Sequence, residues 1–141
     1  MLQEERAPEL IERIFWSTYR GCANYSLNPA QWAALRFFAD PRIEKKTSSE
    51  FAKFHQTTRG TANQTVLALI RKGYLKRDVS PTDHRSKSVS LTHAGVEALK
   101  RDPIRPLSDV IDRLDPMERD RLGVQLKNVY ERLRLMQHTT N

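Results

Sequence analysis

The sequence contains one cysteine, five glycines and no long hydrophobic run. The single cysteine, Cys22, excludes an intramolecular disulfide framework and is typical of a reducing compartment. No apolar stretch approaches the roughly 20 residues needed to cross a bilayer. The first ten residues, MLQEERAPEL, are acidic where a secretory signal is basic. We therefore expect a soluble, cytoplasmic protein with no membrane partner.

The residue groupings that carry enzyme chemistry are also missing. The sequence has no Ser-His-Asp or Cys-His arrangement and no glycine-rich loop that could cradle a phosphate. The sequence therefore predicts a protein that is not an enzyme and that binds neither a metal nor another cofactor. The histidines lack the spacing of metal ligands: His55, His84, His93 and His138.

Positive charge is in excess, and the excess is confined to the middle of the chain, which carries a formal net charge of +7 as a whole. Residues 41–101 contain 13 Lys and Arg against five Asp and Glu, a net charge of +8. The remaining residues contain 11 against 12, a net charge of −1. A basic middle between neutral ends is typical of a nucleic-acid footprint, although a solvated basic face gives the same count.

Helical periodicity and capping signals predict helices at both ends of the chain. Apolar residues spaced near 3.6 predict a first helix over residues 8–23. The sequence NPAQ at residues 28–31 is a capping signature that opens a second helix. A cap at Asp115 precedes an apolar stripe of about five turns from Leu122 to Met136.

The basic middle predicts a helix-turn-helix followed by a β-hairpin. TSSE at residues 47–50 opens a short helix that ends near His55. The polar run at residues 56–58 leads into a second helix, which carries Ala62, Val66, Leu69 and Ile70 on one side and is closed by RKG at residues 71–73. Strand-forming residues at 74–79 and 88–91 flank a polar turn, which is the pattern of a wing. Thr92 then begins a helical stretch that is interrupted or kinked at Pro103 and Pro106.

Four segments in this order resemble the MarR (multiple antibiotic resistance regulator) family. They are LNPAQWAAL at 27–35, LIRKGYLKR at 69–77, DHRSKSVSLTHAG at 83–95 and LDPME at 114–118. The resemblance spans nearly the whole chain and implies a homodimer, paired through its first and last helices, whose two winged lobes bind double-stranded DNA. It also implies a transcription regulator, typically a repressor, that a small aromatic or phenolic effector can release from a pseudo-palindromic operator.

The expected fold is therefore mainly α with a small β-wing, in one domain over residues 1–141. Residues 27–101 form a winged helix-turn-helix lobe, and residues 8–24 and 104–138 form a dimerisation region. Such a protein would be nucleoid-associated in the cytoplasm. The alternatives are a sequence-tolerant DNA architectural protein and a winged-helix module that binds another protein.

The second helix of the predicted helix-turn-helix carries the candidates for reading DNA. Asn63 and Gln64 have the donor and acceptor groups that match the major-groove edge of adenine. They stand where many MarR members carry Thr-Arg, so the family's base contacts cannot simply be transferred. Arg85 on the wing is expected to enter the minor groove. The predicted DNA-binding residues are Ser48, Thr58, Arg59, Thr61, Asn63, Gln64, Thr65, Arg85 and Lys87.

Several of these residues have a second interpretation. Thr57 or Thr58 can be the N-cap of its helix, and capping also explains Ser48. Lys76, Arg77 and Lys87 are either phosphate contacts or solvated strand residues. Cys22 is either a redox sensor, as in some relatives, or a free buried cysteine. Four aromatic residues line a possible effector cavity or pack in the core: Trp16, Tyr19, Trp32 and Phe38.

Overall fold

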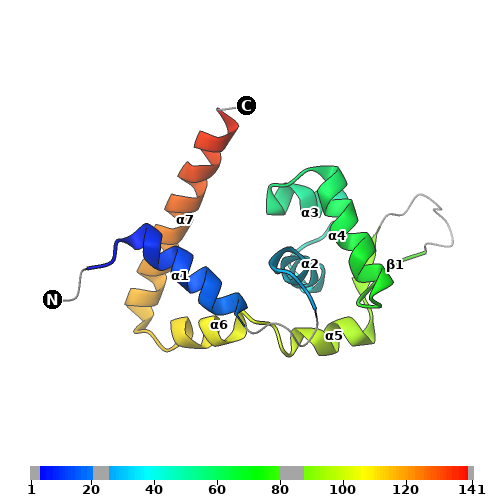
Figure 1. Cartoon of the computed structure of the whole chain (residues 1–141), viewed down its shortest axis with the longest axis horizontal. Helices are drawn as coiled ribbons and strands as arrows, with labels where there is room; N and C mark the ends of the chain where they lie inside the picture. The colour runs from blue at the N-terminus through cyan, green and yellow to red at the C-terminus, as the bar shows by residue number, and fades with distance from the viewer. Residues whose placement is uncertain (1–3, 21–25, 80–87, 140–141) are drawn as a thin grey trace. The chain divides into compact units, whose positions relative to one another are not determined.

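The computed structural model describes residues 4–20, 26–79 and 88–139. Within them the chain is mainly helical with one two-stranded antiparallel sheet (Figure 1), which confirms the predicted fold class. None of the described helices combines the length and apolarity needed to span a bilayer. The elements are α1 (Ala7–Tyr19), α2 (Pro29–Ala39), α3 (Ser48–His55), α4 (Arg59–Arg71), β1 (Leu75–Arg77), β2 (Val89–Leu91), α5 (His93–Leu99), α6 (Arg105–Asp112) and α7 (Pro116–His138).

The structure defines the boundaries of two predicted elements more closely. The stretch that begins at Thr92 is interrupted rather than kinked, because α5 ends at Leu99 and α6 begins at Arg105. Pro103 lies in the gap and Pro106 lies in the first turn of α6, where a proline is tolerated. Helix α1 ends at Tyr19 with Arg20 as its C-cap, and residues 21–23 of its predicted range, with Cys22, lie outside the described residues.

Residues 1–103 and 104–141 form two compact units. In the first unit, α2 is surrounded by α3, α4 and α5 (Figure 1). The strands pair with Leu75 opposite Leu91 and Arg77 opposite Val89. The backbone N–H of Val89 also donates to the carbonyl of Lys46 at 2.8 Å, which joins the segment before α3 to the outer side of β2.

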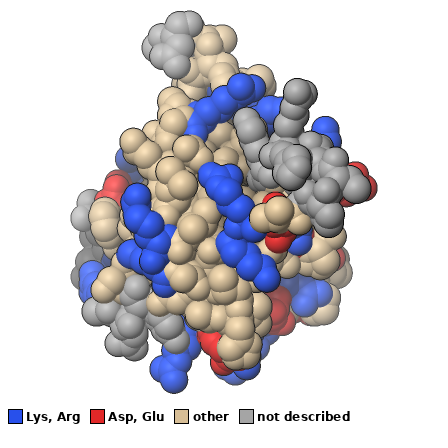
Figure 2. All heavy atoms as spheres, turned by 90° about the vertical axis from the view of Figure 1, so that its right-hand side faces the viewer, with Lys and Arg blue, Asp and Glu red and all other residues tan. Residues whose placement is uncertain are grey.

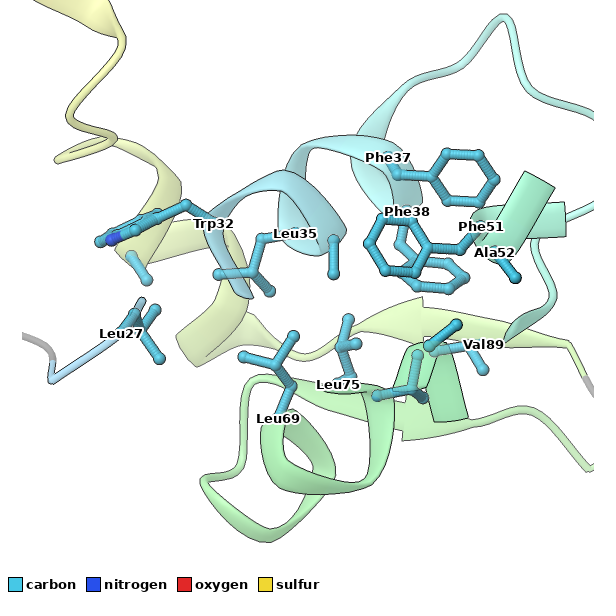
Figure 3. Packing of buried hydrophobic residues seen from close by; sticks show 14 residues of the cluster. Leu27, Trp32, Leu35, Phe37, Phe38, Phe51, Ala52, Leu69, Leu75 and Val89 are labelled. Carbon is cyan, nitrogen blue, oxygen red and sulfur yellow. The ribbon is translucent and has the colours of Figure 1, made fainter. Parts of the chain in front are cut away.

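The core of the first unit is built around the apolar face of α2. Leu35 and Phe38 point from α2 toward side chains of α3, α4 and both strands, whereas Trp32 lies at the other end of the cluster, on the side of Leu27 (Figure 3). Burial of each large apolar side chain contributes on the order of 2 kcal/mol to stability. The largest fully buried side chains are Trp32, Phe38, Phe51, Leu35, Leu69, Leu75, Val66 and Val89.

Capping groups set the helix ends as the sequence predicts. Asn28 Oδ1 accepts from Gln31 N at 2.8 Å, and Gln31 Oε1 accepts from Asn28 N at 2.9 Å, which completes a capping box at α2. Helix α4 ends in a Schellman motif, in which Gly73 N donates to Ile70 O and Tyr74 N donates to Leu69 O. Gly73 has φ +82°, a conformation that favours glycine.

A partly buried ion pair ties α1 and the end of α5 to α2. Arg36 Nη1 donates to Asp102 Oδ1 at 2.6 Å, and Arg36 Nη2 donates to the hydroxyl of Tyr19 at 2.9 Å. Asp102 is 6% exposed, so the guanidinium supplies the countercharge that a buried carboxylate requires. Arg36 therefore joins three segments of the first unit.

Helix α1 and the second unit keep large apolar side chains in contact with solvent. In α1 the apolar residues are between two-fifths and three-fifths exposed, and no residue of α1, α6 or α7 is fully buried. Helices α6 and α7 contact each other, yet α7 exposes most of its apolar residues. The exposed large apolar residues include Leu10, Ile11, Ile14, Phe15 and Trp16 of α1, and Val124, Leu126, Val129, Tyr130, Leu133, Leu135 and Met136 of α7.

Gly95 allows α5 to approach the wing closely. A Cβ at this position would lie 2.2 Å from the carbonyl oxygen of Tyr74, which is backbone and cannot rotate away. We expect Gly95→Ala to lower the free energy of unfolding by about 1–3 kcal/mol, the usual cost of overpacking. Urea unfolding followed by circular dichroism measures this.

The matched control for that substitution is Gly60→Ala in α4, where the nearest atom to the new Cβ lies 4.0 Å away. Alanine should be neutral or stabilising there, because it favours helix more than glycine does. Equal effects of the two substitutions would contradict the close approach of α5 to the wing.

Candidate nucleic-acid interface

Helix α4 begins at a threonine cap. Thr58 Oγ1 accepts from Thr61 N at 3.1 Å and donates to Thr61 Oγ1 at 2.9 Å. The N-cap interpretation of Thr58 is therefore confirmed. Because this hydroxyl is used within the helix, α4 starts at a fixed residue and its outward positions are set.

The outward face of α4 is polar, as its apolar periodicity predicts. Ala62, Val66 and Leu69 are buried, whereas Asn63 and Gln64 are exposed. Gln64 has no hydrogen bond to another described residue, so its amide is free to meet a ligand. Thr65 is half-buried and its hydroxyl donates to the carbonyl of Thr61 at 3.1 Å, which leaves its methyl group as the part available for contact.

A surface hollow lies where α3, α4 and β1 meet. Ser48 belongs to this hollow, and its hydroxyl is buried without a hydrogen-bond partner among the described residues. Thr47 is the N-cap of α3, accepting from Glu50 N at 3.2 Å, so capping is the role of Thr47 and not of Ser48. The hollow is lined by Thr47, Ser48, Ser49, Arg59, Gly60, Asn63 and Arg77.

Lys and Arg side chains gather on the face where α4 and β1 lie (Figure 2). Arg59, Lys76 and Arg77 are exposed and form no ion pair with another described residue. Other cations of the same unit are neutralised locally, since Lys53 pairs with Glu50 and Lys100 with Glu97. The positive charge of these three side chains therefore stays available beside α4, where it can attract a polyanion.

Two pKa shifts show which charges are already satisfied. Hydrogen bonds from Arg42 to Asp40 lower the pKa of Asp40 to about 2. The hydrogen bond from Lys100 lowers the pKa of Glu97 below its usual value. Arg42 and Lys100 thus hold their own carboxylates and contribute less to an anion site than Arg59 and Arg77.

The base of the wing is held by Asp78, a residue that the sequence analysis missed. Its carboxylate accepts from Ser88 Oγ at 3.2 Å and from Ser90 Oγ at 2.7 Å, and its backbone N–H donates to the carbonyl of Ser88 at 2.9 Å. An acidic residue at the end of a basic strand was the only signal for this role. Arg85 and Lys87 lie outside the described residues.

The four aromatic candidates for an effector cavity occupy different environments. Trp32 and Phe38 are 1% and 2% exposed and pack in the core (Figure 3). Tyr19 is half-buried and bonded to Arg36, whereas Trp16 is 61% exposed. Trp16 lines a hollow on α1 with Leu10, Arg13, Ile14, Ser17 and Arg20.

Comparisons with known proteins identify the lobe and the fold. A model described as a winged helix DNA-binding domain matches residues 27–95, a DNA-binding module rather than an enzyme. No curated protein matches the chain.

Three solved structures cover most of the chain at low identity. FabT of Streptococcus pneumoniae in complex with DNA is 24% identical, with a TM-score of 0.66, over 92% of this chain and 96% of that chain. MepR of S. aureus in complex with DNA is 17% identical, with a TM-score of 0.71, over 89% and 92%. A MarR family transcription regulator is 20% identical, with a TM-score of 0.67, over 93% and 88%.

These matches agree with the element order, and they confirm the resemblance found in the sequence. Residues 27–95 therefore resemble a winged helix DNA-binding domain, and the chain shares its fold with solved transcription regulators that include a MarR family member.

Proposed function

We propose that this protein is a sequence-specific transcription regulator that binds a pseudo-palindromic operator as a homodimer, and acts as a repressor. The observation that carries the proposal is the exposed polar face of α4 beside Arg59 and Arg77, which have no ion-pair partners among the described residues. The DNA complexes of FabT and MepR, which share the fold, support it.

Helix α4 would lie in the major groove. Its exposed side chains include Gln64, whose amide can donate to and accept from an adenine edge. Arg85 of the wing would enter the minor groove and Lys87 would meet phosphate. The proposed DNA contacts are Ser48, Thr58, Arg59, Thr61, Asn63, Gln64, Thr65, Arg85 and Lys87.

A second copy of the chain would cover the apolar faces of α1 and α7. Monomeric proteins rarely leave so many large apolar side chains exposed on two helices, and such a surface is typical of a protein–protein interface. Two copies related by a twofold axis would place two α4 helices on one duplex. This arrangement explains why an operator would have two half-sites.

An aromatic or phenolic effector would act near α1. Trp16 offers an exposed indole beside the guanidinium groups of Arg13 and Arg20 in one hollow. Tyr19 is the nearby aromatic residue that is bonded to the lobe, through Arg36. Trp32 and Phe38 would contribute through core packing.

The salt dependence of DNA binding tests the electrostatic part of the proposal. Six or more phosphate contacts per dimer predict that log K falls with log salt with a slope of about −5 or steeper. Fluorescence anisotropy titrations between low and moderate salt measure the slope. Arg132→Gln in α7 is a control that should leave this slope unchanged. If the affinity of the wild-type protein for DNA hardly changes with salt, a protein-binding module is favoured instead.

Base reading is tested at Gln64. Gln64→Ala should cost about 1–3 kcal/mol on a duplex selected from random sequences and little on a scrambled duplex. The control is Glu131→Ala on α7, which lies away from the side of the helix that carries Leu133 and should change neither affinity. Equal losses on both duplexes would show that this side chain does not read sequence.

Dimerisation is tested on α7. Leu133→Asp should convert the dimer to monomers and weaken DNA binding, because a charge would be buried in the apolar interface. Asn128→Asp adds the same charge away from the apolar stripe and should leave the dimer intact. Sedimentation velocity measures both, and a wild-type protein that sediments as a stable monomer would refute the dimer.

A further inference from the structure

The hollow between α3, α4 and β1 has the properties of an anion site. Its lining includes two arginines from different elements, Arg59 of α4 and Arg77 of β1. No carboxylate lines it, and neither arginine pairs with another described residue. The hydroxyl of Ser48, also in the lining, is buried without a partner in the described parts of the chain.

Two helix N-termini converge on the same hollow. Ser48 and Ser49 are the first two residues of α3, and Arg59 and Gly60 are the first two residues of α4. The backbone N–H groups at these positions have no partner within their helices. Aligned peptide dipoles add positive partial charge at such ends, so the two helices attract an anion together with the two guanidinium groups.

Asn63 faces this hollow, whereas Gln64 does not belong to its lining. Asn63 is four residues from Arg59 and three from Gly60, and these spacings place it on the same side of α4 as both. Gln64 is the next residue and therefore points about 100° away around the helix. The two adjacent amides thus meet different surroundings, although the sequence offers them as equivalent.

We propose that the hollow binds one phosphate of the DNA backbone in each half-site, and that Asn63 and Arg77 hold this phosphate while Gln64 reads a base. The proposal rests on the proposed function, because it requires that α4 bind DNA. It assigns Asn63 to positioning rather than base reading, and it resolves the two interpretations of Arg77 in favour of phosphate contact. Contacts of this kind fix register and orientation without carrying sequence information.

Affinity measurements on two duplexes separate the two roles. Asn63→Ala should weaken binding to the selected and the scrambled duplex by the same factor, on the order of 10-fold, which is typical of a lost hydrogen bond to a charged group. The selected consensus should stay the same. A loss confined to the selected duplex, or an altered consensus, would overturn the assignment of Asn63.

Arg77→Gln tests the charge in the hollow. It should weaken binding to both duplexes and reduce the salt slope by about one for each protomer. Lys100→Gln is the control, since Lys100 pairs with Glu97 and does not line the hollow. Equal changes in slope for the two variants would overturn the claim that Arg77 has a specific phosphate partner.

A neutral phosphate analogue identifies the contact directly. Single phosphates of the selected duplex are replaced with methylphosphonate, one position at a time. At one position per half-site the replacement should weaken binding of the wild-type protein. At that same position it should weaken binding of Arg77→Gln and Asn63→Ala only slightly, because these variants have already lost the contact. If at every position the affinity loss from methylphosphonate is as large for the variants as for the wild-type protein, the hollow does not hold a phosphate. If the wild-type protein prefers no DNA sequence at all, the proposed function fails, and this outcome is distinct from failure of the phosphate site alone.

Discussion

The structure depends on burial of the apolar face of α2. Leu35 and Phe38 meet side chains of α3, α4 and both strands, so a single helix organises the whole lobe. Interiors of this kind are close-packed, and a shift of one element would require the others to move. Because the buried side of α4 is fixed against α2, its polar side is fixed toward solvent. The orientation of the proposed DNA-reading surface is therefore a consequence of core packing.

Backbone contacts extend this constraint from the core to the wing. Val89 bonds to the carbonyl of Lys46, and Gly95 lets α5 approach the carbonyl of Tyr74. These contacts join the segment before α3, the sheet and α5 into one body. The start of α3, the start of α4 and Arg77 consequently meet around one hollow. A phosphate site assembled from three elements requires such a rigid frame, since ligand contacts are productive only when their groups are held in place.

The ends of the chain have the opposite character. Helices α1 and α7 expose large apolar side chains, while Arg36 connects Tyr19 of α1 to Asp102 beyond α5. Under the proposed function, a change at the helical ends would reach the lobe through this partly buried ion pair. The unequal charge of the chain fits the proposed function, in which the basic middle would face DNA and the nearly neutral ends would associate.

The sequence by itself determined the element order, the capping residues and the outward face of α4, because these depend on local periodicity and on hydrogen bonds between residues close in the chain. It could not separate Asn63 from Gln64, identify Asp78 as the brace of the wing, or exclude Trp32 from a cavity. Those outcomes depend on which distant segments meet. Only the tertiary structure decided them, since packing of α3 and β1 against α4 gives two adjacent amides different neighbours.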